Sequence, residues 1–366
     1  MRKLASVQRI ETIHPIEGCD QIGLAQVMGW QVIVRYDQFK EGDLCIYFEI
    51  DSLLPETEAF EFMRSKSFRV RTMKMKGVIS QGLCMPLRIL PEKEYAVGDD
   101  VTDILGVKKY EVEAEPSVPS EKSKYTPFQK FLLRHKLTAA LGKRLCGQGN
   151  FKRAFPSFVQ KTDETRVENM PWVLKEKNIL FEAHEKVDGQ SGTFFYRKGK
   201  KCFGLFHKDV FGVCSRNYWL VKKDNSSYWS VADRYTLDVV LPLLLKEAND
   251  GSSWICLQGE CIAPGVQKNK YHVDQPDLYC FNLITENGGK MDSIPASALV
   301  QKFGLQWVPL VDGGYSLPDT VEALQAFVHG ESKLYPTLRE GIVFRNYEKG
   351  ISFKCVDPAY LLKWKE

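Results

Sequence analysis

The chain has 366 residues, of which 44% are hydrophobic and 26% charged, a balance that excludes collagen-like, mucin-like and wholly disordered proteins. The length exceeds that of one ordinary domain, so we expect two domains joined by a linker. Because the sequence has no apolar run long enough to cross a bilayer and no apolar core of a secretory signal, we expect a soluble intracellular protein, cytoplasmic or nuclear, that contacts no membrane.

Short strands separated by turn residues are expected over residues 1–106. The expected strands are Gln26–Val34, Asp43–Ile50, Phe68–Lys74 and Gly82–Pro86. Glycine and proline interrupt the runs at Gly42, Pro55, Gly77 and Pro91. This pattern predicts a small β-barrel of the OB type, a fold that commonly binds single nucleic acid strands or strand ends.

Residues 107–153 differ in composition from the rest of the chain. The sequence after Val107 is charged and contains Pro and Ser, which is typical of a linker. Thr126 and Pro127 then suit the N-cap and first position of a helix. Between Glu121 and Arg153, six Lys and three Arg accompany one acidic residue, a local charge of +8 in a chain of net charge +4. We expect this basic segment either to contact a polyanion or to be a solvated helix surface.

From residue 154 onward, strand-like and helical runs are mixed. Expected strands are Ile179–Asp188, Gly192–Tyr196, Trp254–Ile262, Leu278–Ile284, Gly341–Arg345 and Ile351–Val356. Expected helices are Ser227–Asn249, Asp319–Val328 and Pro358–Trp364. A tight turn at Asn287-Gly288 favours antiparallel hairpins over repeated βαβ units. The fold class expected for this part is therefore α+β.

The ten cysteines and six histidines are dispersed along the sequence. The sequence has no Cys-x-x-Cys pair and no Cys/His cluster, so we expect reduced core thiols instead of disulfides or a structural zinc site.

The stretch Phe181-Glu-Ala-His-Glu-Lys-Val-Asp-Gly-Gln-Ser191 carries the most chemical information. Alternate residues of a strand share a face, so Glu182, His184, Lys186 and Asp188 are expected on one polar face. A lysine flanked by carboxylates can act as a nucleophile on phosphorus. Lys-x-Asp-Gly is weak evidence by itself, because a chain of this length contains it by chance about one time in ten.

The order of the segments that follow strengthens the interpretation. They supply an arginine after a strand, a carboxylate that ends a strand, an aromatic strand and a hairpin with charged residues near its open end. These segments are Phe211–Asn217, Gln258–Asn269, Tyr279–Leu283, Glu340–Arg345 and Ser352–Val356.

In that order and spacing, the segments resemble the motifs of the covalent nucleotidyltransferases, the superfamily of ATP-dependent ligases and capping enzymes. Further segments make the chain similar to RNA ligases of the Deinococcus and Naegleria type: Trp30, Gly42–Ser52, Ser80–Leu83, Phe155–Phe158 and Lys161–Asn169. The resemblance covers nearly the whole chain apart from Val107–Asn150. It implies an α+β protein with an N-terminal OB-type β-barrel (1–106), a basic linker with a helix (107–153) and an ATP-grasp-like nucleotidyltransferase domain of antiparallel sheets and helices (154–366).

The resemblance also implies roles for individual residues. Lys186 is expected to attack the α-phosphorus of ATP and to carry AMP as a phosphoramidate. Two ions of Mg²⁺ or Mn²⁺ are expected: a catalytic ion held through its waters by Asp188, Glu260 and Glu340, and a second ion that orients the leaving pyrophosphate. The other nucleotide contacts expected are Glu185 and Gly189 beside the lysine, Phe281 on the adenine, Arg216 on ribose or phosphate, and Lys354 on the α-phosphate.

Several assignments have an alternative. Phe281 could be a plain core aromatic, Arg216 a surface ion pair, and Lys363 either a phosphate contact or a cation at a helix end. His184 shares the polar face and has no assigned role. Two positions depart from some RNA ligases, which have a second lysine where this chain has Val356 and an asparagine where it has Ser191.

The function implied is that of an ATP-dependent RNA ligase that joins a 3′-OH and a 5′-phosphate, with nicks in duplex RNA as the expected substrate, and we expect it to act as a monomer. A DNA ligase or capping enzyme normally carries its OB domain after the last motif, and only twelve residues follow Lys354 here. A non-catalytic OB protein would not need the charged motif residues, and a protein-modifying adenylyltransferase would not need an RNA 5′-phosphate. Transfer of labelled AMP to the protein distinguishes a ligase from the non-catalytic OB protein. The need for an RNA 5′-phosphate distinguishes it from the protein-modifying adenylyltransferase.

Overall fold

The computed structural model describes residues 3–110, 152–199, 201–202, 205–206, 208–221 and 226–364. The helix expected after Thr126, and nearly all of the basic segment, therefore lie outside the described residues. The chain divides into two compact units. Unit 1 takes its residues from Met1–Val112, Glu164–Lys186 and Pro309–Glu366, and unit 2 takes its residues from Glu113–Asp163 and Val187–Val308.

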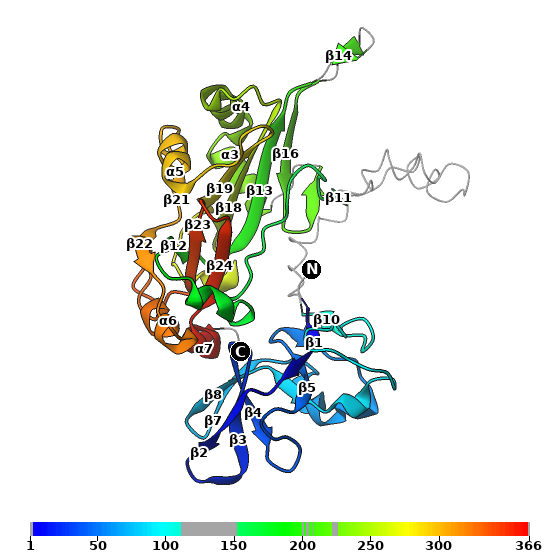
Figure 1. Ribbon diagram of the computed structural model, residues 1–366. Helices are drawn as coiled ribbons and strands as arrows, with labels where there is room; N and C mark the ends of the chain where they lie inside the picture. The colour runs from blue at the N-terminus through cyan, green and yellow to red at the C-terminus, as the bar shows by residue number, and fades with distance from the viewer. Residues whose placement is uncertain are drawn as a thin grey trace, which may run out of the picture. The chain divides into compact units, whose positions relative to one another are not determined.

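The N-terminal part of unit 1 consists of short antiparallel strands and two 3-10 helices. The strands are β1 (Ala5–Arg9), β2 (Thr12–Ile16), β3 (Cys19–Val27), β4 (Trp30–Arg35), β5 (Leu44–Phe48), β6 (Ser52–Leu53), β7 (Thr72–Met75), β8 (Val78–Gln81), β9 (Leu83–Met85) and β10 (Lys108–Lys109). The 3-10 helices are Glu58–Lys66 and Leu87–Ile89. Strands pair in the orders β1-β5-β9, β2-β3-β4, β7-β8 and β10-β6. These short paired strands, in blue and cyan in Figure 1, agree with the short N-terminal strands expected from the sequence.

Two expected strands of this region differ from the structure. The run Phe68–Lys74 is a strand only from Thr72 onward, in β7, since Phe68 has a left-handed φ of +56°. Gln26–Val34 is not a single strand, because β3 ends at Val27 and β4 begins at Trp30. Met28 between them has a φ of +53°, so the chain reverses there and Val27 pairs with Trp30. The apolar run continues through this tight turn, which is why its hydrophobicity alone did not reveal the break.

The C-terminal part of unit 1 is a second sheet with helices. Its elements are the 3-10 helices Val167–Asn169 and Pro171–Lys175, the strands β12 (Leu180–Lys186), β22 (Leu310–Ser316), β23 (Gly341–Asn346) and β24 (Ile351–Val356), and the helices α6 (Val321–Val328) and α7 (Pro358–Trp364). The strands form an antiparallel sheet in the order β22-β12-β23-β24. One face buries Phe181, Ala183, Ile342, Phe344 and Phe353, and by strand alternation the other face carries Glu182, His184 and Lys186.

The two parts of unit 1 share a hydrophobic core. Val356 at the end of β24 and Leu361 in α7 belong to the same buried cluster as Trp30, Tyr47 and Cys84 of the N-terminal strands. Segments from opposite ends of the sequence therefore stabilise each other, since burial of apolar area is the main favourable term in folding.

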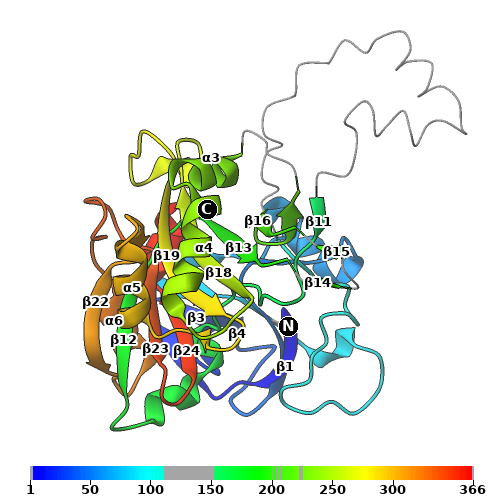
Figure 2. The same ribbon diagram turned by 90° about the horizontal axis from the view of Figure 1, so that it is seen from above.

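Unit 2 is built on a large sheet. Its strands are β11 (Lys152–Ala154), β13 (Gln190–Arg197), β14 (Lys201–Cys202), β15 (Leu205–Phe206), β16 (Val210–Cys214), β17 (Tyr218–Leu220), β18 (Trp254–Ile262), β19 (Asp277–Thr285), β20 (Gly289–Lys290) and β21 (Gln306–Trp307). The main sheet has the order β11-β17-β16-β13-β18-β19-β20, with β21 added in parallel to β19. The helices are α3 (Ser227–Arg234), α4 (Leu237–Ala248) and α5 (Ser293–Gln301), with a 3-10 turn at Gln267–Asn269. These three α-helices pack against β13, β16, β18 and β19, as Figures 1 and 2 show.

Two expectations for unit 2 have clear outcomes. The hairpin at Asn287-Gly288 is confirmed, because β19 turns back to pair with β20. The single helix expected over Ser227–Asn249 is wrong, because α3 ends at Arg234 and α4 begins at Leu237. Thr236 lies between them with a φ of +45°, a left-handed conformation that ends the first helix.

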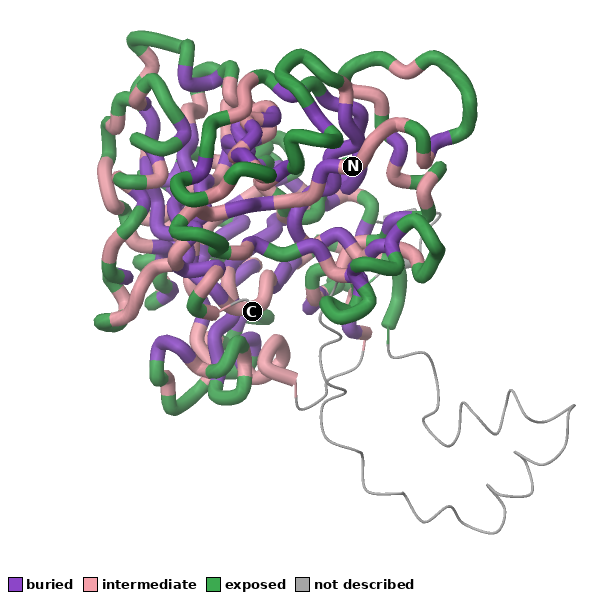
Figure 3. Tube along the Cα trace, turned by 90° about the horizontal axis from the view of Figure 1, so that it is seen from below, coloured by how far each residue is buried: buried purple, intermediate pink, exposed green. Residues whose placement is uncertain are grey.

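Figure 3 colours the Cα trace by burial: buried residues run through its interior, and exposed residues lie on its outer segments. The eight cysteines whose side chains are described are all free thiols, and all but Cys19 are buried, as expected. Within the described part of the chain, no helix is long and apolar enough to cross a membrane.

Candidate active site

Lys186 is the last residue of β12 and lies beside Gly341 of β23. Its Nζ donates a hydrogen bond of 2.6 Å to Oε2 of Glu340, whose side chain is only 7% exposed. The lysine side chain is 25% exposed, so the amine has access from outside while the carboxylate fixes its position. The structure thus brings together two residues that lie 154 positions apart in the sequence.

Gly341 explains how Glu340 comes so close to the lysine. A Cβ on residue 341 would lie 2.4 Å from the carbonyl oxygen of Cys355. Only glycine therefore allows β24 to approach β23 at this point. The Glu-Gly pair at the start of the hairpin serves a packing need as well as a chemical one.

The polar face of β12 continues into its neighbours. His184 is 4% exposed, and its Nδ1 has no hydrogen-bond partner among the described residues. Burial, followed by the positive charge of Arg345, lowers the pKa of His184 to about 4. Lys354 lies two strands away, opposite Val343, and its backbone N–H donates to the carbonyl oxygen of Thr165. The predicted nucleotide contact Lys354 is thus on the same sheet as Lys186.

Glu185 lies on the opposite side of β12, since successive side chains of a strand alternate. Its carboxylate accepts hydrogen bonds from the Ser332 hydroxyl at 2.5 Å and the Lys333 N–H at 2.8 Å. Burial raises the pKa of Glu185, and these two hydrogen bonds oppose the rise. These two hydrogen bonds hold the loop at Ser332 and Lys333 against β12.

In unit 2, Asp188 and Gly189 lead into β13. The Asp188 carboxylate forms an ion pair with Lys270, and both side chains are 3% exposed. The Asp188 N–H donates to the Tyr271 hydroxyl at 2.9 Å. Sequence reasoning missed Lys270 and Tyr271, because they follow a 3-10 turn 82 and 83 residues away and no local pattern distinguishes them from surface residues.

Gly189 connects Asp188 to Glu260. Its N–H donates to Oε1 of Glu260 at 3.0 Å, and a Cβ at this position would lie 2.5 Å from the Cys261 carbonyl oxygen. Glu260 itself lies on β18 opposite Ser191 of β13. Ser191 exchanges a hydrogen bond of 2.6 Å with the Thr162 hydroxyl, a contact that the sequence did not predict. The predicted residues Asp188, Gly189 and Glu260 are therefore close neighbours in unit 2.

Arg216 lies at the surface beside Asp163, and Phe281 lies in β19. The Arg216 guanidinium lies 3.3 Å from the Asp163 carboxylate, and both side chains are nearly half exposed. Phe281 lies at the bulge where the register of β18 and β19 shifts, and it is partly buried. Both geometries are compatible with a ligand contact and with the simpler roles of a surface ion pair and a packed aromatic. Lys363 lies in α7 with its Nζ over the Trp364 ring at 5.0 Å.

The predicted metal ligands are distributed over both units. Glu340 belongs to unit 1, whereas Asp188 and Glu260 belong to unit 2. Among the residues that the structure describes, no cluster of three or more His, Cys, Asp or Glu side chains is arranged to hold a metal ion. The oxygen donors are nonetheless of the type that Mg²⁺ and Mn²⁺ prefer, and Mg²⁺ usually keeps several of its waters.

Comparison with known proteins identifies the family. An RNA ligase family model matches residues 180–365, and an OB-fold domain model matches residues 4–87. The chain is similar to the solved structure of Naegleria gruberi RNA ligase with PPi, at 30% identity over 100% of this chain and 99% of that chain, with a TM-score of 0.78. A glutamate-to-alanine mutant of that ligase with ATP and Mn is 31% identical, with 100% of both chains covered and a TM-score of 0.78.

A third similar structure is another glutamate-to-alanine mutant of the Naegleria gruberi enzyme with AMP and Mn, at 29% identity and a TM-score of 0.78, covering 100% of this chain and 99% of that chain. No curated protein sequence matches the chain. The family matches and the full-length structural similarity agree with each other: the chain belongs to the RNA ligase family, with an OB-fold domain preceding the ligase domain.

Proposed function

We propose that the protein is an ATP-dependent RNA ligase that joins a 3′-OH to a 5′-phosphate through a lysyl-AMP intermediate and an RNA-adenylate. The observation that carries this proposal is the position of Lys186, a partly exposed side chain at the end of β12 whose Nζ is held 2.6 Å from Glu340. Val187 follows it, and then Asp188 and Gly189. An amine fixed in this way can attack a phosphorus atom once it has lost a proton.

In the first step, Nζ of Lys186 forms a bond to the α-phosphorus of ATP. The bond between that phosphorus and the oxygen of the β-phosphate breaks, pyrophosphate leaves, and the lysine loses a proton. Glu340 orients the amine by accepting its 2.6 Å hydrogen bond. The solved structures of the Naegleria gruberi enzyme with ATP, AMP and PPi support a nucleotide of this kind as the substrate here.

Two divalent cations, Mg²⁺ or Mn²⁺, fit the residues present. Asp188, Glu260 and Glu340 would hold the catalytic ion in part through water, and Asp188 and Glu340 are carboxylates buried beside lysines. When bound, such ions neutralise charge on the phosphates and orient the leaving pyrophosphate. For the other nucleotide contacts we propose the predicted set, Gly189, Arg216, Phe281 and Lys354, together with the backbone of Glu185, whose carboxylate is occupied by Ser332 and Lys333.

In the second step, an oxygen of the RNA 5′-phosphate attacks the α-phosphorus of lysyl-AMP, and the phosphorus–nitrogen bond breaks to release Lys186. In the third step, the RNA 3′-OH attacks the activated 5′-phosphorus and AMP leaves. Both steps require two RNA ends to be held in line. We propose a nicked RNA duplex as the substrate, a monomer as the active form, and an OB domain over residues 1–106 as one source of RNA contacts. The basic linker over residues 107–153 and a transferase domain over residues 154–366 complete the proposed division.

The test combines two assays on the full chain. ATP labelled at the α-phosphate should label the protein, and the adduct should survive denaturing electrophoresis. A 5′-phosphorylated nick in duplex RNA should then be sealed faster than free single strands. If the protein is not labelled with AMP, the covalent mechanism is wrong. If it is labelled but seals single strands as fast as the nick, the duplex substrate is wrong.

A further inference from the structure

Among the described residues, the α-helices of unit 2 pack on one face of its sheet, and the opposite face carries Ser191 and Glu260. Alternate residues of β13 on this face are Ser191, Thr193, Phe195 and Arg197. Their partners on β18 are Glu260, Gln258, Cys256 and Trp254. With a rise of about 3.3 Å per residue, Arg197 lies about 20 Å along the sheet from Ser191.

Residues Phe158–Thr162 run along this face beside β13. The Phe158 ring contacts Phe195 and Trp254 with centroid distances of 5.2 and 5.1 Å. Two residues later, the Gln160 carbonyl oxygen accepts a 2.8 Å hydrogen bond from Gln258, and after two more Thr162 meets Ser191. The segment therefore connects the far end of the face to the residues beside Glu260.

Three exposed cations border this segment, each over an aromatic ring. Arg197 lies over Phe158 at 5.5 Å, Arg153 over Trp219 at 5.5 Å and Lys161 over Phe155 at 5.9 Å. We name these six residues the basic–aromatic strip. Distances within about 6 Å of a ring centroid are those of cation–π contacts. The Phe158 and Trp219 rings are themselves held in place, since each makes an edge-to-face contact with Phe195.

The strip carries three positive charges, of which Lys161 also donates a 3.3 Å hydrogen bond from Nζ to Oδ1 of Asn217. Among the described residues, no carboxylate forms an ion pair with Arg153, Lys161 or Arg197, whereas the neighbouring Arg216 is paired with Asp163. A cation that rests on a ring keeps its outer edge available to a second partner. An arginine fixed in this way presents its planar fork to a phosphate with little loss of conformational freedom.

We propose that the basic–aromatic strip binds the phosphodiester backbone of an RNA strand and directs its end toward the part of the sheet that carries Ser191 and Glu260. This inference rests on the proposed function, because it takes the end of an RNA strand as the reacting group. Phosphates bind Arg153, Lys161 and Arg197, and the partly exposed edges of the rings contact bases. Cations interleaved with aromatic rings along a track are the features with which proteins hold single strands without reading their sequence.

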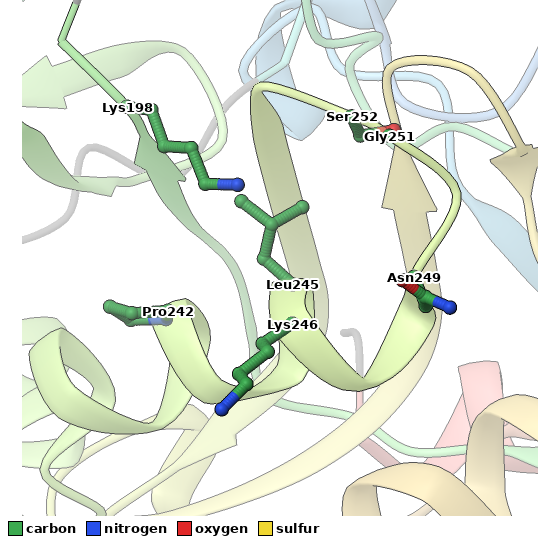
Figure 4. A pocket seen from close by; sticks show the side chains of 7 residues that line it. All are labelled: Lys198, Pro242, Leu245, Lys246, Asn249, Gly251 and Ser252. Carbon is green, nitrogen blue, oxygen red and sulfur yellow. The ribbon is translucent and has the colours of Figure 1, made fainter.

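The structure offers a matched control for charge. Lys198 follows Arg197 in the sequence and, together with Lys246 of α4, lines a separate hollow with Pro242, Leu245 and Asn249 (Figure 4). Both lysines are exposed. The double variant Arg153→Gln/Arg197→Gln and the double variant Lys198→Gln/Lys246→Gln each remove two positive charges.

The experiment measures RNA binding of the full chain without ATP at several salt concentrations, together with AMP labelling of each variant. Separate arms use a 5′-phosphorylated single strand, a strand ending in 3′-OH, and a nicked duplex. The strip variant should bind RNA about 10-fold or more weakly than the wild type. For single strands, the slope of log K against log salt concentration should become shallower by about 0.7 for each lost phosphate contact. The control variant should bind as the wild type does, and AMP labelling of both should stay within about 2-fold of wild type.

A loss of affinity in any arm supports the proposal and shows which strand the strip holds. Unchanged binding in all arms overturns it, as does an equal loss in the Lys198→Gln/Lys246→Gln control. A parallel loss of AMP labelling also overturns it, because the strip would then support the nucleotide site or the fold. Absence of AMP labelling in the wild type contradicts the proposed function but leaves the binding comparison readable.

Discussion

At the scale of single residues, the first prediction concerns Lys186, which is proposed to be the nucleophile that carries AMP. Lys186→Ala should abolish covalent labelling by α-labelled ATP, because it removes the amine held against Glu340. Lys186→Arg should fail as well, since arginine keeps the charge but does not deprotonate in proteins. Gel electrophoresis after incubation with labelled ATP measures both. Clear labelling of the Lys186→Ala protein would exclude this lysine as the nucleophile.

Glu260 and Glu340 provide a second residue-level prediction. Glu260→Ala and Glu340→Ala should each slow AMP labelling by roughly 100-fold or more, because each removes a charge proposed to act on the nucleotide or its metal ions. Glu348→Ala is the control, since this carboxylate is exposed in the turn between β23 and β24. The measurement is the initial labelling rate across a Mg²⁺ titration. If both glutamate variants are labelled at the wild-type rate at every Mg²⁺ concentration, neither glutamate acts on the nucleotide or its metal ions.

His184 makes stability depend on pH. Its folded pKa of about 4 lies below the unfolded value of about 6.5, so the unfolded chain binds more protons between these values and stability falls as the pH drops. The loss between pH 7.5 and pH 5 should be roughly 2 kcal/mol. Urea unfolding of the wild type and His184→Gln at both pH values isolates this contribution. An equal pH effect in the two proteins would show that His184 is not its source.

At the scale of elements, the hairpin β23–β24 places Glu340 beside β12. Gly341→Ala should destabilise the protein by about 1–3 kcal/mol, because the added methyl group meets the Cys355 carbonyl oxygen at 2.4 Å. It should also slow AMP labelling by displacing Glu340. Gly313→Ala is the control, since the nearest atom to its Cβ is 3.8 Å away. Equal unfolding midpoints in urea for both variants would contradict this account of the hairpin.

The elements also show where sequence patterns succeed. Trp254–Ile262, Ile351–Val356 and Pro358–Trp364 have the bounds expected from the sequence, because each is bordered by residues that end regular structure. The break between α3 and α4 was not predicted, since apolar residues continue through Thr236 at near-helical spacing. A left-handed residue without glycine leaves little trace in a hydrophobic pattern.

At the scale of the whole molecule, the shared core of unit 1 couples the two ends of the chain. Leu361 of α7 is 6% exposed and packs with Trp30 and Tyr47. Leu361→Ala should cost about 2–5 kcal/mol, and amide exchange should accelerate in the N-terminal strands as well as in α7. Leu243→Ala, at a residue that is 44% exposed, should change stability by less than about 0.5 kcal/mol. Acceleration confined to α7 would show that the ends are not coupled.

The sequence by itself determined the residue types, the order of the motifs, the α+β class and the OB-type N-terminal strands. These follow from local periodicity, from turn residues and from a resemblance that depends only on order and spacing. It also indicated that Lys186 and Asp188 belong to a reactive segment, because alternating charged residues followed by a glycine can be recognised in the sequence alone.

Only the tertiary structure decided which distant residues meet. The pairing of Asp188 with Lys270, the contact of Lys186 with Glu340, and the packing of Leu361 among N-terminal strands each join residues far apart in the sequence. Such contacts depend on how strands cross and which faces are buried, and nothing in the local pattern records them. The basic–aromatic strip has the same origin, since its cations come from separate segments that only the sheet brings onto one face.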